Sequence, residues 1–159
     1  MKFPGILTGS LCAAALLAAG CTTSNFGAID TTSTSALSPA TADVSADDLA
    51  RGKAQFRDGN YGLAEKHFRK AVELSATNRE AWLGLAASYD QLGRFDFADR
   101  AYEQLVKLAG RQPRIVNNMG YSALLRGDRA KAAKLLAEAR AGMPGDPVVE
   151  ANLALLGKG

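Results

Sequence analysis

Residues 82–102 read WLGLAASYDQLGRFDFADRAY, and this stretch decides the fold. Apolar side chains recur every three or four positions on both sides of Gly93, which is typical of two amphipathic helices. A glycine between them supplies the positive φ that a tight turn between helices requires. We therefore predict a helix hairpin that turns at Gly93.

The same arrangement returns at a fixed period. Glycines at positions 59, 93 and 127 recur at equal intervals, and each lies just before the start of an apolar periodic segment. Such self-similarity indicates stacked repeats. We expect repeats over 45–78, 79–112 and 113–146, built from helices at 46–58 and 62–74, 80–92 and 96–108, and 114–126 and 130–141. A final helix at 147–157 caps the third repeat.

The middle repeat resembles the tetratricopeptide repeat (TPR), with Trp82, Leu85, Ala86 and Tyr89 before Gly93, and then Ala98 and Tyr102. The third repeat carries the corresponding residues Val116, Met119, Gly120, Gly127, Ala132, Leu136, Ala139 and Pro144. The first repeat departs from the pattern, with Asp48, Arg51 and Gln55 at the usual Trp, Leu and Tyr places. The resemblance implies an all-α solenoid of three antiparallel helix pairs plus the cap.

Small residues are expected wherever paired helices cross, because large side chains would force the backbones apart. On this reasoning we expect Gly52 to face Ala64, Ala86 to face Ala98 and Gly120 to face Ala132. Pro113, Pro144 and Pro147 mark the boundaries between units.

Residues 1–20 differ from the rest of the chain. Lys2 is their only charge, and an uncharged run ends in the small residues that precede signal-peptide cleavage. This pattern predicts an export signal at residues 1–20. The uncharged run is also just long enough for an uncleaved membrane anchor, which remains an alternative.

The segment Ala18-Ala19-Gly20-Cys21 resembles the lipobox of bacterial lipoproteins, in which the cysteine is acylated and becomes the new N-terminus. The match is imperfect, because Leu17 stands one position further from the cysteine than the leucine that such boxes prefer. Removal of Cys12 with the signal would leave Cys21 without a disulfide partner, which favours a lipid on its sulfur. The alternative is a cysteine of no consequence. The lipid would place the protein at the outer membrane, facing the periplasm.

Residues 21–44 complete the anchor. Nearly half of the positions in 22–45 are Ser or Thr, and no helical or strand period is visible. We interpret this segment as a tether between the lipidated cysteine and the repeat domain at 45–159. A flexible chain of this length spans about 25 to 30 Å.

Composition excludes several classes of function. A chain that begins at Cys21 carries 18 basic and 16 acidic residues, a balance too even for a nucleic-acid binder. His67, the single histidine, has no metal-ligand pattern around it and is interpreted as a surface residue. Asp96, Asp99 and Arg100 are interpreted as solvated charge. No catalytic residues, cofactor, metal site or small-molecule substrate is expected, so the chain is predicted not to be an enzyme.

The TPR resemblance implies a concave face lined by the first helix of each repeat, where a helix or extended peptide of a partner protein would bind. It places there Ala46, Leu49, Glu80, Ala87, Asp90 and Gln91, together with the residues predicted to contact the partner, namely Lys53, Phe56, Arg57, Leu83, Arg114, Asn117, Tyr121, Leu124 and Leu125. Leu49, Leu83 and Leu124 have a second interpretation as packing between neighbouring repeats.

The segment 80–159 resembles the TadD-like lipoprotein of the Flp/Tad pilus assembly system. Asn117, Asn118, Gly120, Gly127 and the run from Asn152 to Leu155 carry the match. The resemblance implies an outer-membrane lipoprotein that helps the pilus secretin to assemble and has no activity of its own. Alternatives are a general envelope scaffold for cell-wall or outer-membrane assembly factors, a periplasmic enzyme with an unrecognised site, and a cytosolic chaperone adaptor.

Overall fold

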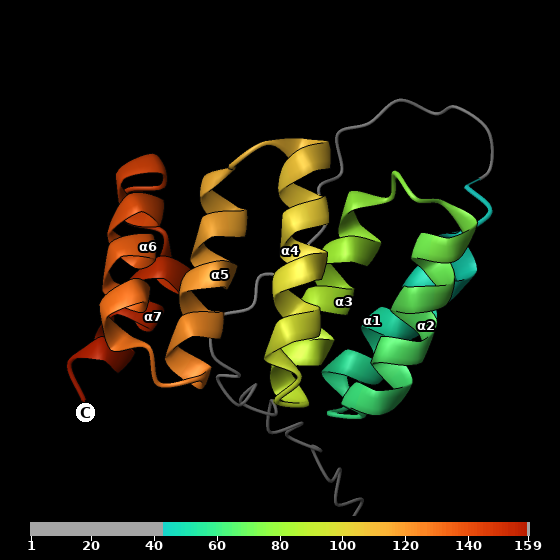
Figure 1. The fold of residues 1–159 in the computed structure, drawn as a ribbon, viewed down its shortest axis with the longest axis horizontal. Coiled ribbons are helices and arrows are strands. Elements are labelled where there is room, and N and C mark those ends of the chain that lie inside the picture. Colours follow the sequence, from blue (N-terminus) through green and yellow to red (C-terminus); the bar gives the residue numbers. More distant parts are fainter. Residues whose placement is uncertain (1–42, 159) are drawn as a thin grey trace, which may run out of the picture.

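The computed structural model describes residues 43–158, and they form seven α-helices, arranged as three antiparallel pairs in a row followed by a last single helix (Figure 1). The predicted signal peptide, Cys21 and most of the predicted tether lie outside these residues. The helices are α1 (Ala46–Arg57), α2 (Tyr61–Leu74), α3 (Arg79–Gln91), α4 (Phe95–Ala109), α5 (Pro113–Leu125), α6 (Arg129–Gly142) and α7 (Pro147–Leu156). The predicted all-α solenoid of three helix pairs and a capping helix is confirmed.

The helix boundaries follow from local chemistry. Gly93 has φ 68° at the turn between α3 and α4, as its place in the repeat predicts. Asn78 caps α3, because its side-chain oxygen accepts a hydrogen bond from the Ala81 amide at 2.9 Å. Pro113 and Pro147 occupy the first turns of α5 and α7, where a missing amide hydrogen costs nothing.

At two of the crossings between paired helices, the residue that faces the glycine is not the expected alanine. A Cβ added at Gly52 would lie 2.7 Å from the ring of Phe68 on α2, so the nearest neighbour of Gly52 is that ring and not Ala64. Gly120 meets Leu136 of α6 at 2.8 Å in the same way. The small residue of each of these first helices therefore receives a large side chain of the second helix.

Phe68 also joins neighbouring pairs. Its ring is 1% exposed, and a Cβ at Gly84 on α3 would lie only 2.5 Å from it. The ring thus lies between the glycine of its own pair and the glycine of the next pair, and it connects α1, α2 and α3. Dispersion contacts of this density are sensitive to a single added methyl group.

Buried apolar side chains form two clusters. The larger spans α2, α3 and α4, with Leu49 and Phe56 of α1 packed against it and Ile115 of α5 included. The smaller consists of Val116, Leu135, Ala139 and Val149, from α5, α6 and α7. Met119 of α5 packs against both. None of the helices within residues 43–158 is long and apolar enough to cross a membrane.

The contact around Phe68 generates a prediction. Gly84→Ala should lower the free energy of unfolding by about 1 to 3 kcal/mol, because the new methyl group overlaps a ring that has no room to move. Urea unfolding followed by circular dichroism measures the change.

Gly62→Ala is the matched control, since nothing lies within 4 Å of a Cβ at this exposed position of α2. This change should stabilise the protein by up to about 1 kcal/mol through the lower entropy of the unfolded chain. Equal effects of the two substitutions would contradict the proposed role of Phe68.

Candidate functional site

The first helices of the pairs lie next to one another and form one face of the domain. Residues of α1 contact α3, residues of α3 contact α5, and residues of α5 contact α7. We call this row of α1, α3, α5 and α7 the first-helix face. It is the surface to which the sequence assigned the partner, and its polar and apolar side chains can be placed one by one.

At the α1 end, Lys53 forms an ion pair with Glu80 of α3, and both side chains are largely buried. Leu83 lies beside this pair and helps to line a small hollow there. Phe56 is half-buried, with its ring centre 5.2 Å from that of Tyr61. The charge of Lys53 is therefore already matched within the domain, whereas Arg57 at the end of α1 is exposed.

At the α5 end, Tyr121 and Leu124 are half-buried and Leu125 is 39% exposed, so an apolar strip remains accessible near the end of this helix. Arg114 is half-buried in the first turn of α5. These residues occupy places from which a partner can be contacted.

Asn117 does not fit its predicted role as a residue that orients a partner. It is 1% exposed, and its side-chain oxygen accepts a hydrogen bond from Asn152 of α7 at 2.9 Å. The capping helix covers this part of α5, so the Asn117 amide serves to attach α7. Ala87 and Asp90, which were also assigned to the concave face, are buried at 0% and 3% exposure.

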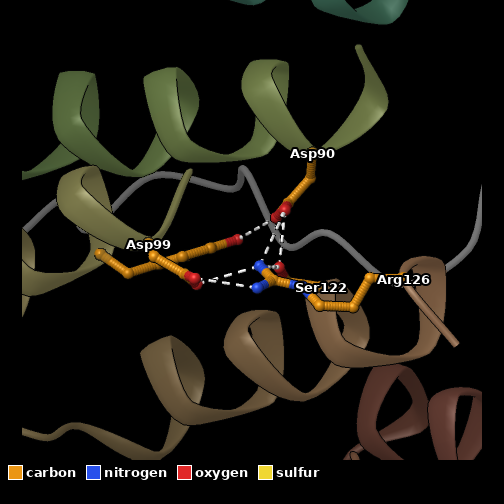
Figure 2. Close-up of polar contacts among 5 residues, drawn as sticks. Asp90, Asp99, Ser122 and Arg126 are labelled. Carbon is orange, nitrogen blue, oxygen red and sulfur yellow. Dashed lines mark hydrogen bonds and ion pairs between the residues drawn. The ribbon is translucent and has the colours of Figure 1, made fainter. Parts of the chain in front are cut away.

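Asp90 belongs to a buried polar network that joins α3, α4 and α5 (Figure 2). Its carboxylate accepts hydrogen bonds from the Tyr102 hydroxyl at 2.9 Å and the Ser122 hydroxyl at 2.6 Å. Arg126, just after α5, lies 3.9 Å from the same carboxylate. Its guanidinium also donates to the Ser122 oxygen at 2.8 Å.

The network extends to the surface through Asp99 of α4. Arg126 donates two hydrogen bonds to its carboxylate, at 2.8 and 2.9 Å, a bidentate arrangement (Figure 2). These bonds hold the pKa of Asp99 below its usual value. The Asp99 side chain is still 44% exposed, so it is solvated as predicted, but its pairing with Arg126 was not predicted. Asp96 and Arg100 are exposed as expected. The guanidinium of Arg126 also lies 4.8 Å from the ring centre of Phe95.

Burial raises the pKa of Asp90 to about 6, although the hydrogen bonds from Ser122 and Tyr102 and the charge of Arg126 oppose the shift. Burial also raises the pKa of Tyr102 well above its usual value, with Asp90 adding to the shift. Two neighbouring groups with shifted pKa values can mark an active site. Here, however, both groups are buried against each other between helices, so the arrangement is a structural one.

His67 is half-buried and not simply a surface residue, since its Nδ1 lies 2.9 Å from an Asp48 oxygen. Among residues 43–158, no group of three or more His, Cys, Asp or Glu side chains is arranged to hold a metal ion.

Comparison with known proteins supports the repeat assignment. A profile described as tetratricopeptide repeat matches residues 55–117. The cytochrome c-type biogenesis protein CycH of Pseudomonas aeruginosa is 29% identical over 112 residues, which is 69% of this chain and 27% of that protein. The chain thus spans about a quarter of the length of this curated relative.

Two solved structures show the fold and contain bound partners. The type III secretion chaperone SycD of Yersinia enterocolitica, in complex with a peptide of the translocator YopD, has 21% identity and a TM-score of 0.63. The match covers 74% of this chain and 92% of SycD. PcrH in complex with the chaperone binding region of PopD has 26% identity and a TM-score of 0.60, over 77% and 92% of the two chains.

Proteins with this fold are typically protein-binding modules and not enzymes. The resemblance to TadD-like proteins gains no support from these relatives. The helices from α1 to α7 form a tetratricopeptide-repeat solenoid, and the chain is similar to proteins that hold other polypeptides.

Proposed function

We propose that this protein is a docking module that binds a helix or extended segment of a partner protein on the first-helix face. The apolar strip of half-buried Tyr121 and Leu124 and exposed Leu125 carries the proposal, because accessible apolar side chains on a helix suit the apolar side of a peptide. Arg57 at the end of α1 and Arg114 in the first turn of α5 add positive charge to the same face and would orient an acidic or polar segment. Two proteins of similar fold are solved with bound polypeptides, SycD with a peptide of the translocator YopD and PcrH with the chaperone binding region of PopD.

We further propose that Cys21 carries a lipid that tethers the domain to the outer membrane on its periplasmic side. Several acyl chains on one residue anchor stably, at about 0.8 kcal/mol per buried CH₂. The leading context is assembly of a Flp/Tad pilus secretin, on the resemblance of residues 80–159. A general scaffold for envelope assembly factors is the alternative.

The similarity to CycH favours a second candidate, a role in the biogenesis of c-type cytochromes. The two contexts can be separated by deleting the gene. Loss of secretin multimers with normal c-type cytochromes supports the pilus role, and the reverse result supports the cytochrome role. A deletion that leaves both unchanged contradicts both contexts while leaving the docking proposal to its own test.

The docking face can be tested inside cells with a photo-crosslinking amino acid. At Tyr121 it should give one defined crosslinked product, because this side chain lies on the accessible strip, and mass spectrometry would identify the partner. The matched control places the same amino acid at Lys134, an exposed position on α6. Products of equal yield and identity at both positions would show that contact on the strip is not specific.

Leu125→Asp should reduce the yield of the Tyr121 crosslink at least tenfold, because it places a charge in the apolar strip. Circular dichroism should show unchanged helical content, since Leu125 is exposed. If the variant unfolds, Leu125 belongs to the packing between repeats.

The lipid anchor has an independent test. Metabolic labelling with palmitate should mark the wild-type protein, and Cys21→Ala should abolish the label and move the protein from the membrane fraction to the soluble fraction. Label that persists in Cys21→Ala would overturn the lipid proposal but would not affect the docking face.

A further inference from the structure

The domain is divided into two halves that meet at α5. The larger apolar cluster holds α1 to α4 together, and the smaller one holds α5 to α7 together. Ile115 of α5 belongs to the first cluster, whereas its neighbour Val116 belongs to the second. Each half therefore has its own core, and α5 is the element that both share.

The junction between the halves is narrow. α2 lies along α3 over most of its length, whereas α5 contacts α3 and α4 over a much smaller part. Tyr102 takes the place that Phe68 has in the first pair, and its hydroxyl donates to the Asp90 carboxylate. Because burial of apolar area is the main source of cohesion, rotation at this junction is the least restrained relative movement of the helix pairs.

The apolar contacts of α5 with the first half come from Ile115 and from Met119 in the middle of the helix, whereas the polar contacts lie at its C-terminal end. Ile115 lies in the first turn of the helix and is 4% exposed against the larger cluster. Ser122 and Arg126 lie at the other end, in the network with Asp90 and Asp99 (Figure 2). The helical rise between Ile115 and Ser122 is about 10 Å. This geometry is that of a pivot at Ile115 and a polar latch at Ser122 and Arg126.

The charges of the latch do not balance when Asp90 is ionised. The groups that face it are Tyr102 and Asp99 from α4, and Ser122 and Arg126 from α5 and its C-terminal cap. Arg126 is already neutralised by its two hydrogen bonds with Asp99. An ionised Asp90 therefore leaves one excess negative charge in a buried site, which is unfavourable.

A protonated Asp90 removes that excess charge and keeps the contacts. The Tyr102 hydroxyl can still donate to Oδ2, and the carboxyl and the Ser122 hydroxyl can exchange donor and acceptor roles across the 2.6 Å contact. The protonated network is neutral overall.

We propose that the junction of the second and third helix pairs is a hinge, which pivots at Ile115 and is held closed by the Asp90–Ser122 and Asp99–Arg126 contacts, and that protonation of Asp90 tightens it. The movement changes the angle between the two halves of the first-helix face. It thereby sets whether Leu83 on α3 and Tyr121 on α5 can contact the same partner segment.

The raised pKa of Asp90 places the transition near pH 6. Between about pH 4 and pH 6 the folded protein binds more protons than the unfolded chain, so the free energy of unfolding contributed by this group rises as the pH falls through 6. With a pKa of about 6 in the folded protein and 3.8 as the ordinary value, the unfolding equilibrium constant should fall about tenfold between pH 7.5 and pH 5.

Thermal unfolding of the full chain between pH 7.5 and pH 5 tests the energetic part. Asp90→Asn cannot titrate at this position, so the melting temperature of the wild type should rise relative to that of this variant as the pH falls. Asp96→Asn, at an exposed site on α4, is the control and should show the same pH dependence as the wild type. A constant difference between the wild type and Asp90→Asn at all pH values overturns the proposal.

Spin labels test the movement itself. In the full chain with Cys12 and Cys21 replaced by Ser, cysteines at the exposed Lys66 of α2 and Lys134 of α6 report across the junction. A second pair at Lys66 and Lys107 of α4 reports within the first half. The 66/134 distance distribution should be broad at pH 7.5 and narrow at pH 5, while the 66/107 distribution stays unchanged.

In Asp90→Asn the 66/134 distribution should be narrow at both pH values, because the latch is permanently neutral. A 66/134 distribution that is equal at pH 7.5 and pH 5 in the wild type overturns the hinge. An equal change in the 66/107 pair would assign the effect to general loosening of the protein, and this result also overturns it.

Discussion

The structure depends on large side chains of the second helices being received by small residues of the first helices. Phe68 is enclosed between Gly52 and Gly84, and Leu136 rests on Gly120. In the second pair the large side chain is Tyr102, and its hydroxyl donates a hydrogen bond to Asp90 in the polar network. The same packing arrangement therefore gives apolar contacts at Phe68 and Leu136 and a polar one at Tyr102.

That polar contact gives the domain its internal division. An apolar residue at position 102 would remove one of the hydrogen-bond donors to the Asp90 carboxylate. One buried oxygen of Asp90 would then lack its partner in the network with Ser122 and Arg126. The polar junction is thus coupled to the choice of Tyr at a core position. Functionally, it lies between the parts of the first-helix face that carry Leu83 and Tyr121.

The sequence predicted the architecture because the signals for it are local and repeated. Gly93 and its equally spaced equivalents locate the turns, and the apolar period places the helix ends close to where the structure has them. The candidate site was predicted less well. Asn117 was assigned to the exposed face by its place in the repeat, but its environment is set by Asn152, far along the chain on the cap.

The polar network of Asp90, Ser122, Asp99 and Arg126 was not predicted, for a similar reason. Asp90 and Ser122 belong to different repeats, and so do Asp99 and Arg126, so no single repeat contains either pair. Repeat analysis assigns each position from its own unit, whereas these contacts join adjacent units. An isolated acid in the otherwise weakly polar segment 81–92 was the available signal for Asp90.

The amide pair beneath α7 determines how the stack ends. The hydrogen bond from Asn152 to Asn117 is fully enclosed, and Asp146 fixes the start of the same helix by accepting from the amides of Val148 and Val149. If α7 were shifted by one residue, a buried side-chain amide would lose its hydrogen-bond partner, at a cost of about 1 to 3 kcal/mol. These contacts therefore allow α7 only one position along the third helix pair. The helix covers apolar surface of that pair, and its polar contacts fix where it lies.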